Sequence, residues 1–436
     1  LDQYSLMSNA STDYYSTKYT SVIRPEKTAI DEMIYLEAER MDKLVLQEKF
    51  VPSEINIVER EREVRLDQPF SVLMDQIWKS AYGNQYLGRL PIGDLKELKS
   101  IKMDELNKFY RTWYAPNNAV MVIAGKFDKK QVLDTVEKNF NSIAARTVPK
   151  QVNVPVLDSS KIQERAFEVK KGSDFGEHNI YLNGKNQQIQ TALALSPFLF
   201  TMQPSGHLYK DVVETGTATQ VQSTTWLTQD FNLVFMGAVY APNHDAQKVG
   251  SALMQGIEKK HSFNEVELNR VKNLIKNSQK SMMTSASAVG GMLSDYVVSS
   301  NGDWTQYFKD QAEVQNLKVN DVNQIINQFL IAEHRISGDI KPTPEDQKKA
   351  LELQKGAETA KTLDQQDTKA EPLKDPSVYK AEVAQNLTMS QQYVEKIDQK
   401  IQTGTLKNGM QYALFPTSTR DDKTYASISL NFGTAE

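Results

Sequence analysis

The spacing of apolar residues is helical in several segments near the start of the chain and alternating in two others. The helical segments are residues 24–44, 52–67, 71–83 and 102–114. In the first, Ile30, Met33 and Ile34 fall on one helix face. Residues 9–23, rich in Ser, Thr and Tyr, predict an exposed or edge strand, and the apolar run AVMVIAG at residues 119–125 predicts a second strand.

The same signals divide the chain into four parts. The first unit, residues 1–147, mixes helices and strands, and an extended Pro- and Val-bearing stretch follows it. A second unit, residues 148–343, contains a strand-like run at FNLVFMGAVYA, two long helical patterns and a closing strand at RISGDI. Residues 344–400, rich in Lys, Gln, Glu, Asp and Ala, predict a linker, and residues 401–436 predict a β-hairpin that opens a third unit.

Composition and charge exclude several classes of protein. The chain has 436 residues, too many for one compact core, and 39% of them are hydrophobic, as in ordinary globular proteins. With 51 basic and 55 acidic residues, the net charge of −4 gives no general attraction to nucleic acid, which we exclude as a partner. No run approaches the roughly 20 apolar residues of a membrane helix, so we expect no membrane span.

The absence of cysteine rules out a disulfide, a thiolate nucleophile and a Cys-bound metal. It is compatible with an extracytoplasmic bacterial protein, and we take the periplasm as a working assumption. The chain starts at Leu1 without a methionine and stops at SISLNFGTAE, a strand-like pattern. We therefore expect it to be a piece of a longer protein.

Acidic residues interrupt the apolar stripe of the helix predicted at residues 52–67. Glu54 and Glu61 share a face with Ile57, Val58 and Val64, because residues three, four and seven apart lie close together on a helix. An inward carboxylate must be protonated, paired with a cation or bound to a metal. The spacing leaves two interpretations open: a solvated helix on which Glu61 pairs with Arg65 four residues later, or a metal site.

Several segments together resemble the pitrilysin/insulinase family of zinc metallopeptidases, which carry an inverted His-x-x-Glu-His motif. They are SNASTDYYSTKYT, LEAERMDKL, SEINIVEREREVRLDQPF, PIGDLKELKSIKMDELNKFYRTWYAPNNAVMVIAGKFD, GHLYKDVVETGTA and TLKNGMQYALFP. The resemblance implies an α+β fold of tandem homologous α/β sandwich domains, each an antiparallel-rich sheet with helices on one side, arranged as a clamshell. The first unit would be the remainder of one peptidase-like domain, and the second an inactive domain of related fold.

The resemblance also implies roles for particular residues. Glu61 matches the family's glutamate ligand to Zn²⁺, and Glu54 matches a glutamate that supports that ligand from two turns earlier. Glu59 is the nearest competitor, but it lies off the apolar stripe. Asn9 and Ala10 match the family's edge strand, whose backbone pairs with an extended peptide substrate.

The family's two histidine ligands and catalytic glutamate have no counterpart in this chain. The five histidines are His178, His207, His244, His261 and His334, and none has a His-x-x-Glu-His neighbourhood. In the family the motif helix precedes the strand that SNAST resembles. We therefore expect a fragment of a zinc endopeptidase that cleaves peptides or unfolded polypeptides in a chamber, together with the rest of its polypeptide. The alternative is a non-catalytic relative that serves as a binding or partner subunit.

Overall fold

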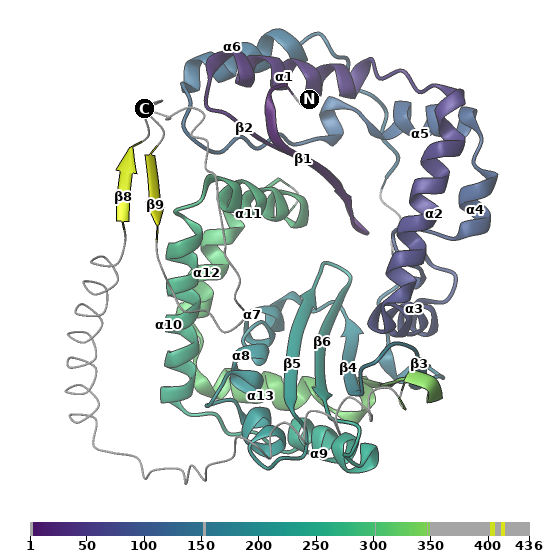
Figure 1. The fold of residues 1–436 in the computed structure, drawn as a ribbon, viewed down its shortest axis with the longest axis vertical. Helices are drawn as coiled ribbons and strands as arrows, with labels where there is room; N and C mark the ends of the chain where they lie inside the picture. Colours follow the sequence, from purple (N-terminus) through teal and green to yellow (C-terminus); the bar gives the residue numbers. More distant parts are fainter. Residues whose placement is uncertain are drawn as a thin grey trace. The chain divides into compact units, whose positions relative to one another are not determined.

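Figure 1 shows the computed structural model of the chain, which describes residues 3–150, 154–300, 302–346, 348, 402–405 and 411–414. The chain divides into two compact units, residues 1–358 and 359–436. Within the described residues, no helix is long and apolar enough to cross a membrane. The linker predicted at residues 344–400 lies almost entirely outside the described residues.

The N-terminal segment folds as a two-stranded hairpin followed by helices. Strand β1 (Ser5–Thr12) pairs antiparallel with β2 (Thr17–Ile23), which confirms the predicted exposed strand and splits it in two. Helix α1 (Lys27–Asp42) packs against α6 (Lys129–Phe140) around Ile30, Ile34 and Val132. The other helices of this segment are α2 (Val51–Asp67), α3 (Pro69–Tyr82), α4 (Leu95–Ser100) and α5 (Met103–Trp113).

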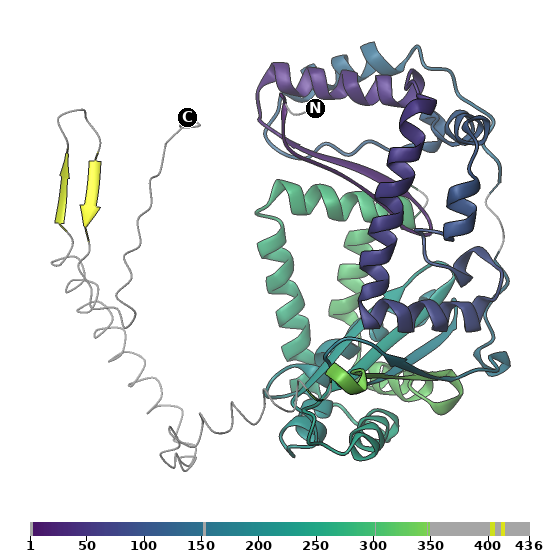
Figure 2. The same ribbon diagram turned by 45° about the vertical axis from the view of Figure 1, so that its right-hand side comes forward.

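Pro69 separates two of these helices. Helix α2 ends at Asp67, and α3 begins at the proline, which suits a first helical position because its missing N–H would have no partner there. The two consecutive helices and the bend between them are visible in Figure 2. The sequence therefore predicted this boundary correctly.

One predicted strand is not formed. Residues 119–125 form no helix or strand and pair with no strand among the described residues, and Val120 and Met121 are 63% and 41% exposed. An apolar segment becomes a strand only when a neighbour takes up its backbone hydrogen bonds. The prediction was wrong for the chain as it stands because such a neighbour is not among the described strands.

A mixed five-stranded sheet forms the centre of the first unit. Its strands are β3 (Ala166–Lys170), β4 (Gly176–Gly184), β5 (Gln220–Leu227), β6 (Phe231–Val239) and β7 (Arg335–Lys341). The spatial order is β3-β7-β4-β6-β5, with β3 parallel to β7 and the other pairs antiparallel. This sheet and its helices confirm the predicted α+β class, and β6 and β7 lie where the sequence predicted strands.

Helices cover both faces of this sheet, whereas the sequence analysis expected them on one side. Alternate residues such as Tyr181 and Val234 face one apolar core, and their neighbours Ile180 and Leu233 face another. The first core is completed by α7 (Gln190–Leu193), α8 (Ser196–Thr201), α9 (Ala246–Glu258), α10 (Glu265–Met282) and α13 (Val319–Phe329). Helices α11 (Ala286–Ser299) and α12 (Gln306–Asn316) lie between α10 and α13 in the chain.

The opposite face of the sheet is covered by α3, which comes from the segment assigned above to the first domain. Its fully buried Leu73, Ile77 and Trp78 belong to the same core as strand residues Ile180 and Ile336. This packing crosses the predicted boundary at residue 147, and the boundary itself stays a prediction.

The second compact unit is described only in a hairpin. Strand β8 (Gln402–Thr405) pairs antiparallel with β9 (Gln411–Leu414), which confirms the hairpin predicted at the start of residues 401–436. The strand pattern at SISLNFGTAE lies outside the described residues.

Candidate functional site

Helix α2 carries the predicted zinc ligand Glu61 and its supporting residue Glu54. No residue of α2 is buried, and Ile57 and Val64, on the same stripe, are 60% and 59% exposed. The expected inward-facing stripe is therefore on the surface of the described chain. The helix itself formed as predicted, because Pro52 at its first turn and the long-chain residues that follow favour it.

Glu61 is paired with Arg65 in the way that the simpler interpretation expected. Oε1 of Glu61 accepts hydrogen bonds from Nη2 of Arg65 at 2.8 Å and from Nε at 3.2 Å. Both side chains are about half exposed, at 52% and 57%. Such a pair leaves the carboxylate accessible, and it releases easily because exposed pairs contribute roughly 0–1 kcal/mol.

The competing residue Glu59 is held elsewhere. Its Oε1 lies 2.8 Å from Nζ of Lys99 on α4, and its side chain is 23% exposed. This contact ties α2 to α4 and turns Glu59 away from the stripe that carries Glu61. The geometry therefore gives Glu59 a structural partner in a neighbouring helix.

Strand β1 carries Asn9 and Ala10, the predicted peptide-binding residues. They pair with Thr20 and Tyr19 of β2, and β2 is the only strand beside β1 among the described strands. The Asn9 side chain accepts a hydrogen bond from the Ala10 N–H at 2.9 Å. The other edge of β1 thus offers backbone groups to an added strand, as an edge strand does.

Three histidines are placed away from any metal-like arrangement. His178 is buried in the sheet, where its Nδ1 contacts the Gly338 carbonyl oxygen at 3.0 Å and burial lowers its pKa. His334 contacts the Phe329 carbonyl oxygen through Nδ1 and the Asn183 side chain through Nε2. His244 is partly exposed and contacts the Asn243 side chain and the Gly216 carbonyl oxygen.

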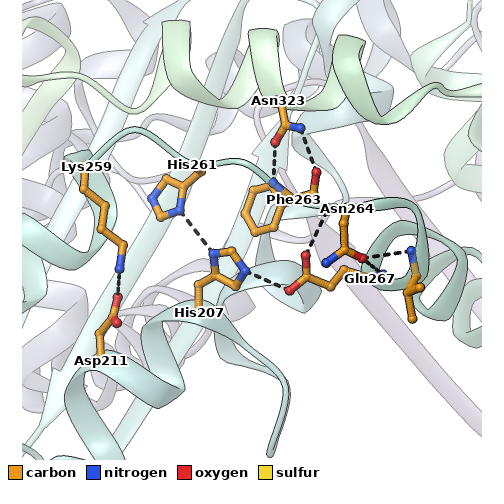
Figure 3. A network of polar contacts seen from close by, with 9 residues as sticks. His207, Asp211, Lys259, His261, Phe263, Asn264, Glu267 and Asn323 are labelled. Atoms are coloured by element: carbon orange, nitrogen blue, oxygen red, sulfur yellow. Dashed lines mark hydrogen bonds and ion pairs between the residues drawn. The ribbon is translucent and has the colours of Figure 1, made fainter.

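The other two histidines belong to a polar network between α9 and α10 (Figure 3). Nδ1 of His207 lies 3.4 Å from Nδ1 of His261, and Nε2 of His207 lies 2.9 Å from Oε1 of Glu267. His261 also contacts the Ile257 carbonyl oxygen through Nε2 at 2.9 Å, and burial lowers its pKa to about 4. These contacts anchor the loop before α10, so we assign the network a structural role.

A second polar cluster lies where β4 and β7 meet α9. Glu177 and Asp339 are directly opposed in the β4–β7 register and line a cavity of about 400 Å³. The Tyr240 hydroxyl donates to Oε1 of Glu177 at 3.3 Å, and burial, followed by the neighbouring Asp339, raises the pKa of Glu177 to about 8. Sequence analysis missed these residues, since polar groups inside a strand gave no pattern of their own.

The residues of a zinc site are not brought together in the described chain. No group of three or more His, Cys, Asp or Glu side chains able to hold a metal occurs among the residues that the structure describes. Glu61 therefore has a suitable oxygen donor but no second or third ligand beside it, whereas catalytic zinc takes three protein ligands. The described residues do not by themselves fit a zinc ion.

Comparison with known proteins identifies relatives of the chain. Residues 100–275 match the family model described as the Peptidase M16 inactive domain. The zinc protease PqqE of Helicobacter pylori is 26% identical over 334 residues, which cover 74% of each protein. The probable zinc protease PqqL of Escherichia coli is 22% identical over 278 residues, which cover 61% of this chain but only 29% of PqqL.

Solved structures share the fold. A protease from Helicobacter pylori superimposes with a TM-score of 0.67 at 25% identity, covering 77% of this chain and 82% of that one. The periplasmic protease PqqL from Escherichia coli superimposes with a TM-score of 0.64 over 95% of this chain, which corresponds to 47% of PqqL. At 16% identity this second likeness shows the fold alone. The family match, the relatives and the fold agree with the resemblance seen in the sequence, and residues 100–275 are identified as an inactive-type domain of the M16, pitrilysin-like, peptidase family.

Proposed function

We propose that this chain is part of a zinc metalloendopeptidase that cleaves peptides or unfolded polypeptides inside a chamber. The observation that carries the proposal is the relationship to PqqE, a zinc protease by name, which extends over 74% of both proteins. The similarity therefore extends over most of the length of both proteins.

In this proposal α2 and β1 supply two parts of one active site. Glu61 is one zinc ligand, and Glu54, two turns earlier on the same helix, supports it. The accessible carboxylate of Glu61, which is paired with an exposed arginine, supports this role because it can exchange Arg65 for a metal at little cost. Asn9 and Ala10 present the free edge of β1 to the substrate backbone.

The remaining zinc ligands and the general base belong, in this proposal, to polypeptide outside the present sequence. The described residues hold no three-ligand group, so the chain alone is expected neither to retain zinc tightly nor to cleave peptides. The other half of the chamber is likewise assigned to the rest of the same polypeptide. The 47% coverage of the Escherichia coli PqqL structure supports this on grounds of fold.

We also propose the periplasm as the compartment. The absence of cysteine is compatible with that location, and the structurally similar PqqL is described as periplasmic.

A non-catalytic partner or binding subunit is the second candidate. The observation that favours it is the matching family model, which describes an inactive domain and covers residues 100–275. The two candidates differ in the sequence that precedes Leu1. A His-x-x-Glu-His motif there supports the enzyme, and a degenerate motif supports the binding subunit.

The experiment is a measurement of bound zinc and peptide hydrolysis in the full-length polypeptide that contains this chain. Glu61→Gln should lower the zinc content and abolish hydrolysis, and Glu59→Gln serves as a matched control on the same helix. Zinc lost from the Glu59 variant but kept in the Glu61 variant would overturn the ligand assignment. Zinc-dependent cleavage by the present chain alone would contradict the shared-site proposal.

A further inference from the structure

The turn between β1 and β2 is held rigidly by its own side chains. Oδ1 of Asp13 accepts hydrogen bonds from the backbone N–H groups of Tyr15 and Ser16, each at 2.7 Å. The Asp13 N–H in turn donates to the Ser16 carbonyl oxygen at 2.9 Å. An aspartate that closes a turn in this way fixes the direction in which the next two side chains leave the backbone.

Those two side chains, Tyr14 and Tyr15, reach the central sheet. The Tyr15 hydroxyl donates to Oγ1 of Thr228 at 3.0 Å, and Thr228 lies in the turn between β5 and β6. Figure 1 shows both hairpins, and this hydrogen bond joins their turns. The contact links residues more than 200 positions apart in the chain.

Thr228 is well placed to receive this hydrogen bond. Its hydroxyl donates to the Phe231 carbonyl oxygen at 3.3 Å and accepts from the N–H groups of Asp230 and Phe231 at 3.2 and 3.1 Å. The threonine oxygen is therefore fixed in position by its own turn. A tyrosine that bonds to it is located relative to the whole β5–β6 pair.

Tyr14 adds an aromatic contact beside the hydrogen bond. Its ring lies 5.6 Å from that of Trp226 on β5 and 6.1 Å from that of Trp78 on α3. Trp226 and Trp78 also contact Phe231, so the tyrosine ring joins a cluster that belongs to the second core. Rings at these separations attract one another beyond the area that they bury.

We propose that Tyr14 and Tyr15 are positioning residues, which set the peptide-pairing edge of β1 against the central sheet. The inference rests on the proposed function, because it concerns how the same edge is held. Ala10 lies only three residues from Asp13, roughly 10 Å along an extended strand. A shift of the turn therefore reaches the pairing positions, and a strand that is fixed in advance binds an added strand more tightly.

The chain provides a conservative test of this role. Tyr15→Phe removes the hydroxyl and keeps the ring, and Thr228→Val removes the accepting oxygen. Tyr35→Phe is the matched control, since Tyr35 is exposed on α1. The readout is the affinity of the full chain for fluorescein-labelled, reduced and carboxymethylated lactalbumin, an unfolded probe, measured by fluorescence anisotropy.

We expect Tyr15→Phe and Thr228→Val each to weaken binding about 3- to 10-fold, as the loss of one hydrogen bond would. The double variant should be no weaker than Thr228→Val alone, because Thr228→Val already removes the contact with Tyr15. Thr228→Ser keeps the hydroxyl and should restore binding. A purely structural role would instead lower the melting temperature and leave the affinity unchanged, and that result would overturn the inference.

A further variant separates this inference from the proposed function. Ala10→Pro removes the N–H of a pairing position, and edge strands tolerate proline on their free side. If Ala10→Pro abolishes binding while Tyr15→Phe has no effect, the positioning role is wrong and the peptide-binding edge stands. If Ala10→Pro leaves binding intact, or the unaltered chain does not bind, the proposed edge itself is wrong and the inference falls with it.

Discussion

The carboxyl groups of Glu177 and Asp339 meet on neighbouring strands, because the two residues are direct partners in the β4–β7 register. Around them lie Lys341, whose Nζ is 3.2 Å from Oδ2 of Asp339, and the hydroxyl of Tyr240. Two ionised carboxylates on directly paired residues would repel each other in a buried site. The pair is therefore most stable when one proton is shared, and burial with Asp339 raises the pKa of Glu177 to about 8.

This pair predicts that the chain loses stability as the pH rises. The pKa of Glu177 increases from 4.5 in its ordinary state to about 8 in the fold, so the folded chain holds the proton more tightly. The stabilisation is complete below pH 4.5 and is lost as the pH rises through about 8. Between pH 5 and pH 8, the free energy of unfolding of the unaltered chain should fall by roughly 1–3 kcal/mol more than that of the Glu177→Gln variant. Urea unfolding at both pH values measures this difference.

Glu164→Gln is the control for this measurement, because Glu164 is an exposed glutamate just before β3. It should follow the unaltered chain at every pH. Equal slopes for the Glu177 variant and the unaltered chain would show that the two carboxyl groups do not share a proton.

Protonation of His261 should give stability the opposite pH dependence, with a loss as the pH falls. Burial lowers its pKa from 6.5 to about 4, so its neutral form contributes stability that is present above pH 6.5 and lost as the pH falls through about 4. His261→Asn should cost stability at pH 7, because the ring packs against Phe200 and Phe263. The difference from the unaltered chain should shrink by about 1–2 kcal/mol by pH 4.

Urea unfolding at pH 7, 5.5 and 4 checks this prediction. His244→Asn, at a partly exposed position outside the buried core, is the matched control and should change little. A difference between the His261 variant and the unaltered chain that stays constant with pH would mean that the buried ring is protonated as easily in the fold as in the unfolded chain.

Elements with one dominant pattern could be predicted from the sequence, and elements defined by distant partners could not. The apolar run at β6 and the helical spacing at α9 and α10 identified their elements directly. Strand β4 was missed because Glu177, His178 and Asn179 interrupt its apolar pattern. Their polar atoms are satisfied by Tyr240, Gly338 and Ser337, residues that the sequence alone does not place beside them.

The candidate site shows the same division. Spacing placed Glu54 and Glu61 on one face of a helix, and the helix formed over the predicted residues. What the spacing could not provide was the burial of that face, which depends on other segments packing against it. In the described chain Glu61 instead pairs with Arg65, the partner that lies one turn away on the same helix.

Gly338 has no room for a side chain, because α3 packs closely against the sheet at this position. A Cβ atom at this position would lie 2.4 Å from Cδ1 of Leu73, which is fully buried. Gly338→Ala should therefore destabilise the chain by about 1–3 kcal/mol, the usual cost of overpacking a core. Gly291→Ala is the control, because a Cβ there meets nothing within 4 Å and an alanine favours helix α11.

Thermal or urea unfolding of both glycine variants checks the prediction. The cost of Gly338→Ala should fall when Leu73 is also replaced by alanine, since the clashing atoms are then absent. A penalty that is unchanged in the Leu73→Ala background would mean that α3 does not pack on β7 in this way.

Replacing Glu61 should affect zinc binding without changing the stability of the fold. The partner of Glu61 among the described residues is an exposed arginine one turn away, so Glu61→Gln should change the free energy of unfolding of this chain by no more than about 0.5 kcal/mol. Even that small difference should disappear at high salt, because salt screens exposed charges. Leu73→Ala, at a fully buried position of α3, should by contrast cost about 2–5 kcal/mol under the same conditions.

Urea unfolding at low and high salt measures the effects of both substitutions. A loss above 1 kcal/mol for Glu61→Gln would show that the carboxylate supports the fold. A small loss would leave its accessible oxygen atoms free for a metal ligand's role, which the zinc content of the full-length polypeptide then tests.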